Sequence, residues 1–169
     1  MNQHKLPAVL ALLAACALAA PAATAATSPD IHFMRGAAQG GMTEVVLGKI
    51  AMQNGSNRYV KQFGRQMVRD HSEANHALRR IAINEGVALP KGLGAKNEAL
   101  KRKLSRLHGA AFDRAYVKAM VSDHEEDLAE FQREANHGKD KRVRTFADKY
   151  TPVIQGHLMM AQDMAKKGI

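Results

Sequence analysis

The chain of 169 residues has one cysteine, Cys16, and no tryptophan, and only 5% of its residues are aromatic. A single cysteine excludes an internal disulfide framework and a zinc site built from several cysteines. The 5 prolines and 13 glycines are too few for a collagen-like or proline-rich chain. With 46% hydrophobic and 24% charged residues, the composition is that of an ordinary globular protein with one domain.

Long hydrophobic runs are missing except at the N-terminus. Lys5 precedes an apolar stretch over 6–20, and Ala-Thr-Ala at 23–25 forms a small-x-small cleavage site. This order is typical of a secretory signal peptide, and the stretch is too short for a membrane-spanning helix. We therefore predict a signal peptide at 1–25 and a mature domain at 26–169. The protein should be exported and periplasmic, with no transmembrane helix in its mature part.

The lone cysteine allows a second interpretation. Leu13-Ala14-Ala15-Cys16 resembles the lipobox of bacterial lipoproteins, in which the cysteine is lipidated after cleavage. The apolar run continues beyond Cys16, which favours ordinary cleavage. Lipid anchoring through Cys16 at a bacterial envelope membrane stays open as the alternative location.

Acidic residues are outnumbered, with 16 Asp and Glu against 25 Lys and Arg, so the net charge is +9. The basic residues are spread over the chain, and the densest groups lie at 101–106 and 139–144. An exported protein rarely meets nucleic acid, so we expect no nucleic-acid partner. Anionic envelope lipid or polysaccharide fits the charge better. The oligomeric state is not indicated.

The mature part is patterned for helices alone. Apolar residues recur at spacings of three and four, and alternation by two is absent. The pattern predicts long helices over 30–54, 57–85, 110–136 and 140–166 and a short helix over 95–107. We expect an all-α, antiparallel four-helix bundle with Asp30 as the first N-cap. Pro152 should kink the last helix.

Each long helix carries one ionisable residue on its apolar face. These residues are Glu44, His71, His124 and His157. With about 1.5 Å of rise per residue, all four come within about one helical turn of the same level. Three imidazoles and a carboxylate in a core fit a site for one transition-metal ion such as zinc, iron or copper. A hydrogen-bonded network with trapped water would also satisfy these groups, so both interpretations stay open.

A repeated segment links the second and third long helices. Residues 61–73 and 114–126 share the pattern Met-Val-x-Asp-His-x-Glu, which contains both inward histidines. Its aspartates, Asp70 and Asp123, should either orient a histidine of a neighbouring helix or pair with surface arginines. Its methionines, Met67 and Met120, are candidate soft ligands for copper(I), although methionines on such a face are more often core filler.

Several motifs together support a family resemblance. They are Glu44-x-x-Leu47-Gly48-x-x-Ala51, Val60-x-x-Phe63, Met67-Val68-x-Asp70-His71, Phe112-Asp113-x-x-Tyr116-Val117, Asp123-His124 and Gly156-His157-Leu158. Over 33–164 the chain resembles the exported bacterial family labelled domain of unknown function 4142, whose members are often called outer-membrane proteins. The resemblance implies a ferritin-like helical bundle. The paired Glu plus Glu-x-x-His set of iron ferritins is missing here, which argues against ferroxidase activity.

Catalytic motifs are not apparent. The sequence has no Gly-rich phosphate loop, nucleophile elbow or Ser/His/Asp arrangement, so no catalytic residue is predicted and a redox enzyme ranks third. The first hypothesis is a metal-binding bundle for sequestration or envelope stress protection. The alternative is a non-catalytic envelope interaction module with a structural His/Glu cluster and a basic surface.

Overall fold

The computed structural model describes residues 25–169 and contains only helices in that range. They are α1 (Ser28–Asn54), α2 (Arg58–Asn84), α3 (Gly94–Ser105), α4 (Gly109–His137) and α5 (Lys141–Lys166). The predicted all-α class is confirmed, and each predicted helix end lies within two residues of the observed one. Residues 1–24 lie outside the described range, so signal cleavage and lipidation at Cys16 stay predictions.

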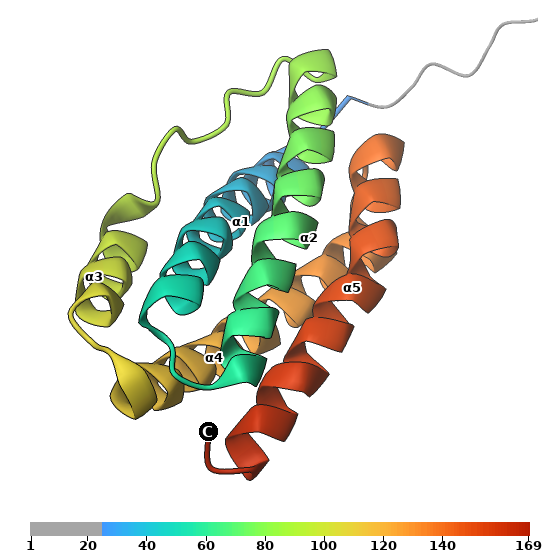
Figure 1. Cartoon of the computed structure of the whole chain (residues 1–169). Coiled ribbons are helices and arrows are strands. Elements are labelled where there is room, and N and C mark those ends of the chain that lie inside the picture. The colour runs from blue at the N-terminus through green and yellow to red at the C-terminus, as the bar shows by residue number, and fades with distance from the viewer. Residues whose placement is uncertain (1–24) are drawn as a thin grey trace, which may run out of the picture.

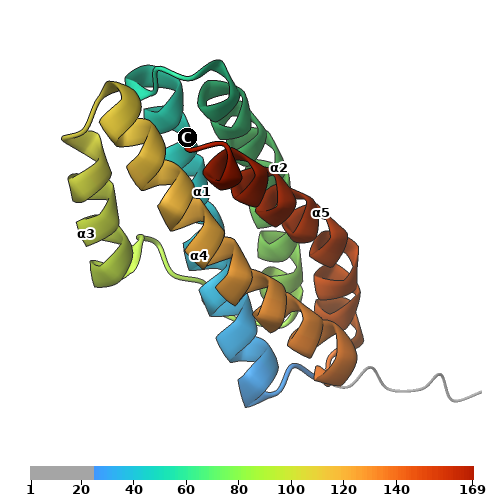
Figure 2. The same ribbon diagram turned by 90° about the horizontal axis from the view of Figure 1, so that it is seen from below.

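The four long helices form two hairpins (Figure 1). α1 packs along α2, and α4 packs along α5, while α1 also contacts α4 and α2 also contacts α5. The short α3 lies on the outside, against α1 and α4 (Figure 2). α5 runs through Pro152 as one helix, and a bend at that residue stays a prediction.

Two glycines bring α1 and α2 together. A Cβ atom on Gly48 would lie 2.6 Å from the carbonyl oxygen of Gly64, and one on Gly64 would lie 2.7 Å from that of Gly48. Real Cβ atoms do not approach backbone that closely, so only glycine fits at both positions. Glu44 lies one turn before Gly48 on α1, so this contact also fixes how close Glu44 lies to α2.

The start of α1 differs from the prediction. Thr27, not Asp30, is the N-cap, and Asp30 lies in the first turn. The Asp30 carboxylate accepts hydrogen bonds from the backbone N–H and the hydroxyl of Thr27, at 2.6 and 2.7 Å. It also accepts the backbone N–H of Lys139 at 2.7 Å. The prediction of Asp30 as the N-cap was wrong. Its carboxylate accepts the backbone N–H of the N-cap residue from a position three residues later in the helix, and it also contacts the turn between α4 and α5.

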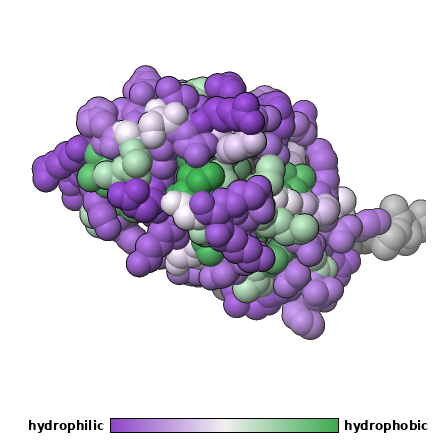
Figure 3. Space-filling view, turned by 60° about the horizontal axis from the view of Figure 1, so that its bottom comes forward, coloured by the Kyte–Doolittle hydropathy of each residue, from purple (hydrophilic) through white to green (hydrophobic). Residues whose placement is uncertain are grey.

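The apolar core has two parts. One surrounds Phe63, Met67 and Met120, and the other surrounds Phe131 and Phe146. Figure 3 shows one face of the molecule, on which hydrophilic side chains predominate and hydrophobic ones form small separate patches. Within residues 25–169, no helix combines the length and the apolar character that crossing a bilayer requires.

Candidate metal centre

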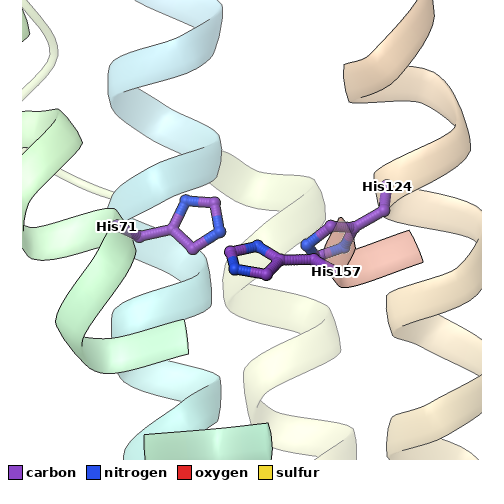
Figure 4. Close-up of side chains that lie close together, drawn as sticks. All are labelled: His71, His124 and His157. Atoms are coloured by element: carbon purple, nitrogen blue, oxygen red, sulfur yellow. The ribbon is translucent and has the colours of Figure 1, made fainter. Parts of the chain in front are cut away.

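The four inward residues of the long helices meet in one layer between the two parts of the core. Glu44 on α1, His71 on α2, His124 on α4 and His157 on α5 are each at most 7% exposed. The three imidazole rings face one another, with ring centroids 5.3 to 5.8 Å apart (Figure 4). The structure thus brings together the four residues proposed from sequence, and their role as metal ligands stays a prediction.

Each imidazole is held through one ring nitrogen. His124 Nδ1 lies 3.0 Å from the carbonyl oxygen of Met120, and His157 Nε2 lies 2.9 Å from Asp70 Oδ2. His71 Nδ1 lies 2.7 Å from Glu44 Oε2. In a neutral imidazole, the nitrogen that donates its N–H to an oxygen leaves the other nitrogen with a free lone pair.

The opposite ring nitrogens have no partner. They are Nε2 of His71, Nε2 of His124 and Nδ1 of His157, all buried and without a hydrogen bond to any residue of 25–169. One potential ligand atom from each of the three histidines lies within 4.8 Å of the other two. Metal-binding histidines are typically held in this way, with one nitrogen fixed by an oxygen and the other facing the ion.

Glu44 is the carboxylate of the layer. Its Oε1 lies 3.2 Å from His124 Nε2, and its Oε2 lies 2.7 Å from His71 Nδ1. Burial alone would raise the pKa of Glu44, yet the adjacent His71 and His124 lower it below the usual value. Glu44 is therefore an ionised carboxylate in the core, with one oxygen beside His71 and the other beside His124.

The histidines differ in charge. Burial lowers the pKa of His157 to about 4, although Asp70 opposes that shift, and burial also lowers the pKa of His124. Burial would lower the pKa of His71, yet the charge and hydrogen bond of Glu44, together with the charges of Asp70 and Asp123, raise it above its usual value. His124 and His157 are thus neutral near pH 7, which is the form that binds metals.

The two repeat aspartates have different surroundings. Asp70 contacts His157 of α5 and also pairs with Arg69 at 2.8 Å, and its role in orienting a metal-binding histidine stays a prediction. Asp123 has a buried Oδ2 without a hydrogen-bond partner among the described residues. It lies beside Glu44 and His124, where burial and then the charge of Glu44 raise its pKa to about 7.

Met67 and Met120 are fully buried in the apolar cluster next to the histidine layer. They pack with Phe63 and Tyr116 in that cluster, as core filler would. Met120 also contributes the carbonyl oxygen that holds His124. A role for either sulfur as a copper ligand stays a prediction.

Sequence reasoning missed Asp127. This residue lines a cavity of about 20 Å³ together with Glu44, Asp70, His71 and His157, which is room for about one water-sized particle. Burial, followed by the charges of Glu44 and Asp123, raises the pKa of Asp127 well above its usual value. Its spacing of four residues from Asp123 on one helix was the available signal, because residues so spaced share a helix face.

Residues 15–164 match the family described as "Domain of unknown function (DUF4142)". The chain belongs to this family. The match confirms the resemblance seen in the motifs, and the outer-membrane label stays a prediction. No curated protein matches this DUF4142 chain.

A solved structure supports the fold. The DUF4142 chain is similar to a crystal structure of a DUF305 fragment from Deinococcus radiodurans, with a TM-score of 0.73 and 14% sequence identity. The alignment covers 85% of this chain and 99% of that fragment. At this identity the likeness establishes a shared helical fold and nothing about function.

Proposed function

We propose that this protein binds one transition-metal ion in its core through His71, His124 and His157, with Glu44 as the fourth ligand after its carboxylate leaves His71 Nδ1. The observation that carries the proposal is the set of three buried, unpartnered imidazole nitrogens, each opposite a nitrogen held by an oxygen. A protein with this site would sequester metal or protect the cell envelope under stress.

The distances suit a tetrahedral ion. Ligands at about 2.1 Å from a tetrahedral metal are about 3.4 Å from one another. The separation of 3.2 Å between Glu44 Oε1 and His124 Nε2 already matches that value. The potential histidine ligand atoms lie within 4.8 Å of one another, so an inward shift of about 1 Å would complete the shell.

The energetics favour an occupant. A buried polar atom without a partner destabilises a fold by about 1–3 kcal/mol. Three such nitrogens lie in this layer, beside the carboxylate of Glu44. A bound cation would satisfy all of them and compensate the buried negative charge. A set of imidazoles with one carboxylate suits zinc, iron or copper.

The finer fold and location belong to the same proposal. We infer that α1, α2, α4 and α5 form a ferritin-like four-helix bundle kinked at Pro152, to which the short α3 is added. The two hairpins support this inference. Export to the periplasm is supported by the sequence of residues 1–25. The net charge of +9 supports contact with anionic envelope lipid or polysaccharide.

Metal analysis of the mature chain, purified without a histidine tag, tests the proposal. We expect one equivalent of metal in the wild type and its loss in His71→Ala and His124→Ala. His76→Ala is the matched control, because His76 is exposed on the same helix as His71.

A metal-free wild type whose melting temperature is unchanged by zinc, copper or iron would refute the proposal. The His/Glu layer would then be a structural network. Salt-sensitive binding to vesicles of anionic lipid would in that case identify an envelope interaction module.

A further inference from the structure

A second group of potential ligands lies next to the three histidines. One ligand atom from each of Glu44, Asp123 and His124 lies within 4.8 Å of the other two. Glu44 and His124 are fully buried, and neither the Glu44 oxygens nor His124 Nε2 has a hydrogen-bond partner within residues 25–169. Asp123 Oδ2 is likewise buried and unpartnered. Two carboxylates and an imidazole therefore converge on one point without satisfying one another.

The two groups share Glu44 and His124. One imidazole nitrogen binds one ion, so both positions cannot be filled together through His124 Nε2. They differ in chemistry, because the second position is rich in oxygen and the first is rich in nitrogen. Oxygen ligands bind hydrated divalent cations, whereas copper(I) prefers sulfur.

Further carboxylates lead from this second position to the surface. Asp123, Asp127 and Glu130 follow one another at steps of four and three, so they share one face of α4. Glu44, beside the inner end of this row, is fully buried, and the Glu130 side chain at the outer end is 42% exposed. The row thus connects solvent with the histidine layer.

Glycines of α1 face this row. A Cβ atom on Gly40 would lie 3.8 Å from Asp127 Oδ1, and one on Gly36 would lie 3.7 Å from Glu130 Oε2. These glycines precede Glu44 at steps of four, so α1 presents Gly36, Gly40 and Glu44 to Glu130, Asp127 and Asp123 in that order. Glycine places no side chain over the carboxylates.

We propose that Asp123, Glu44 and His124 form a receiving position for a divalent cation, which arrives along Glu130 and Asp127 between α1 and α4 and then moves to the three-histidine position. This inference rests on the proposed function and adds to it the class of ion and its route. The carboxylates of Glu130, Asp127 and Asp123 offer oxygen ligands one after another along this route, and oxygen is the ligand that hydrated divalent cations prefer. The ion then exchanges Asp123 for the imidazoles of His71 and His157.

Cobalt(II) is the probe, because its visible absorption reports the ligands around it. In His157→Ala the three-histidine position is incomplete while the receiving position is intact, so weaker Co²⁺ binding should remain. The double variant, with both His157→Ala and Asp123→Asn, should lose that binding. The single substitution His124→Ala should abolish Co²⁺ binding, since both positions need this residue. Circular dichroism checks that each variant is folded.

The route is tested by the rate of Co²⁺ loading in a stopped-flow experiment. Asp127→Asn should slow loading by about tenfold, because it removes a carboxylate from the middle of the route. Glu130→Gln, at a more exposed position, should slow it less and provides a second variant. Glu125→Gln is the control, since Glu125 is exposed on the same helix and loses the same charge.

The outcomes separate the two proposals. If wild type binds Co²⁺ but His157→Ala binds as little as His124→Ala, the receiving position is wrong and the three-histidine site stands. If Asp127→Asn, Glu130→Gln and Glu125→Gln all load at the wild-type rate, the route is wrong. If wild type binds no Co²⁺, both proposals fall.

Discussion

The glycines on the two sides of α1 have different surroundings. On the side facing α2, Gly48 and Gly64 bring two backbones into contact, and a Cβ atom would meet a carbonyl oxygen at 2.6 Å. On the side facing α4, Gly36 and Gly40 leave ordinary van der Waals distances of 3.7 and 3.8 Å to carboxylates. The first arrangement serves close packing, and the second places no α1 side chain against the acidic residues. Glycine therefore permits close helix packing on one face of α1 and, in our proposal, leaves room for the route of an ion on the other.

The largest expected effect is on the side of α1 that faces α2. Gly48→Ala should lower the free energy of unfolding by about 2–3 kcal/mol, because its Cβ would meet the backbone of Gly64 and the helices would have to separate. Urea denaturation followed by circular dichroism measures this loss. A loss below the measurement error would mean that α1 and α2 can separate without cost, which would end the distinction between the two sides.

The next effect concerns how the histidine layer is held. Asp70→Asn removes the carboxylate next to His157 Nε2 and should weaken metal binding by about 10–100-fold. Competition with a chromophoric chelator measures the affinity. Asp148→Asn is the control, because Asp148 is an exposed aspartate on α5. Equal affinities for the two variants would show that Asp70 does not orient His157.

The helices and the inward residues were predictable, because a period of 3.6 residues assigns each side chain to a face. That period placed Glu44, His71, His124 and His157 in one layer without any knowledge of the fold. Asp127 was not found, since its burial depends on how closely α1 and α4 pack, which the sequence does not show. The sequence also could not show which ring nitrogen of each histidine lacks a partner, because neighbouring side chains determine how the imidazole is rotated.

A smaller effect is expected at Asp123, where burial and Glu44 raise the pKa from 3.8 to about 7 in the fold. A group with a raised pKa stabilises the fold below its unfolded pKa, and this contribution is lost as pH rises through 7. Asp123→Asn should therefore stabilise the metal-free protein by about 1–2 kcal/mol at pH 8 and much less near pH 4. Thermal melts at the two pH values measure it. A gain that is the same at both would show that ionisation of Asp123 is not its cause.

The smallest effect is on the side of α1 that faces α4. Gly40→Ala should raise the free energy of unfolding by about 0.5–1 kcal/mol, because alanine favours a helix and its Cβ has room beside Asp127. Its sign is opposite to that expected for Gly48→Ala, so urea denaturation of the two variants side by side tests the comparison. Destabilisation by Gly40→Ala would show that α1 and α4 pack as tightly as α1 and α2.

The most direct test of the metal centre is X-ray absorption at the zinc edge of the untagged mature protein loaded with one equivalent of zinc. We predict nitrogen and oxygen neighbours at about 2.0–2.1 Å, with the outer scattering of three imidazoles. That pattern should be lost in His124→Ala. Sulfur neighbours at about 2.3 Å, or a spectrum of hydrated zinc without imidazole, would contradict the assignment of His71, His124 and His157 as ligands.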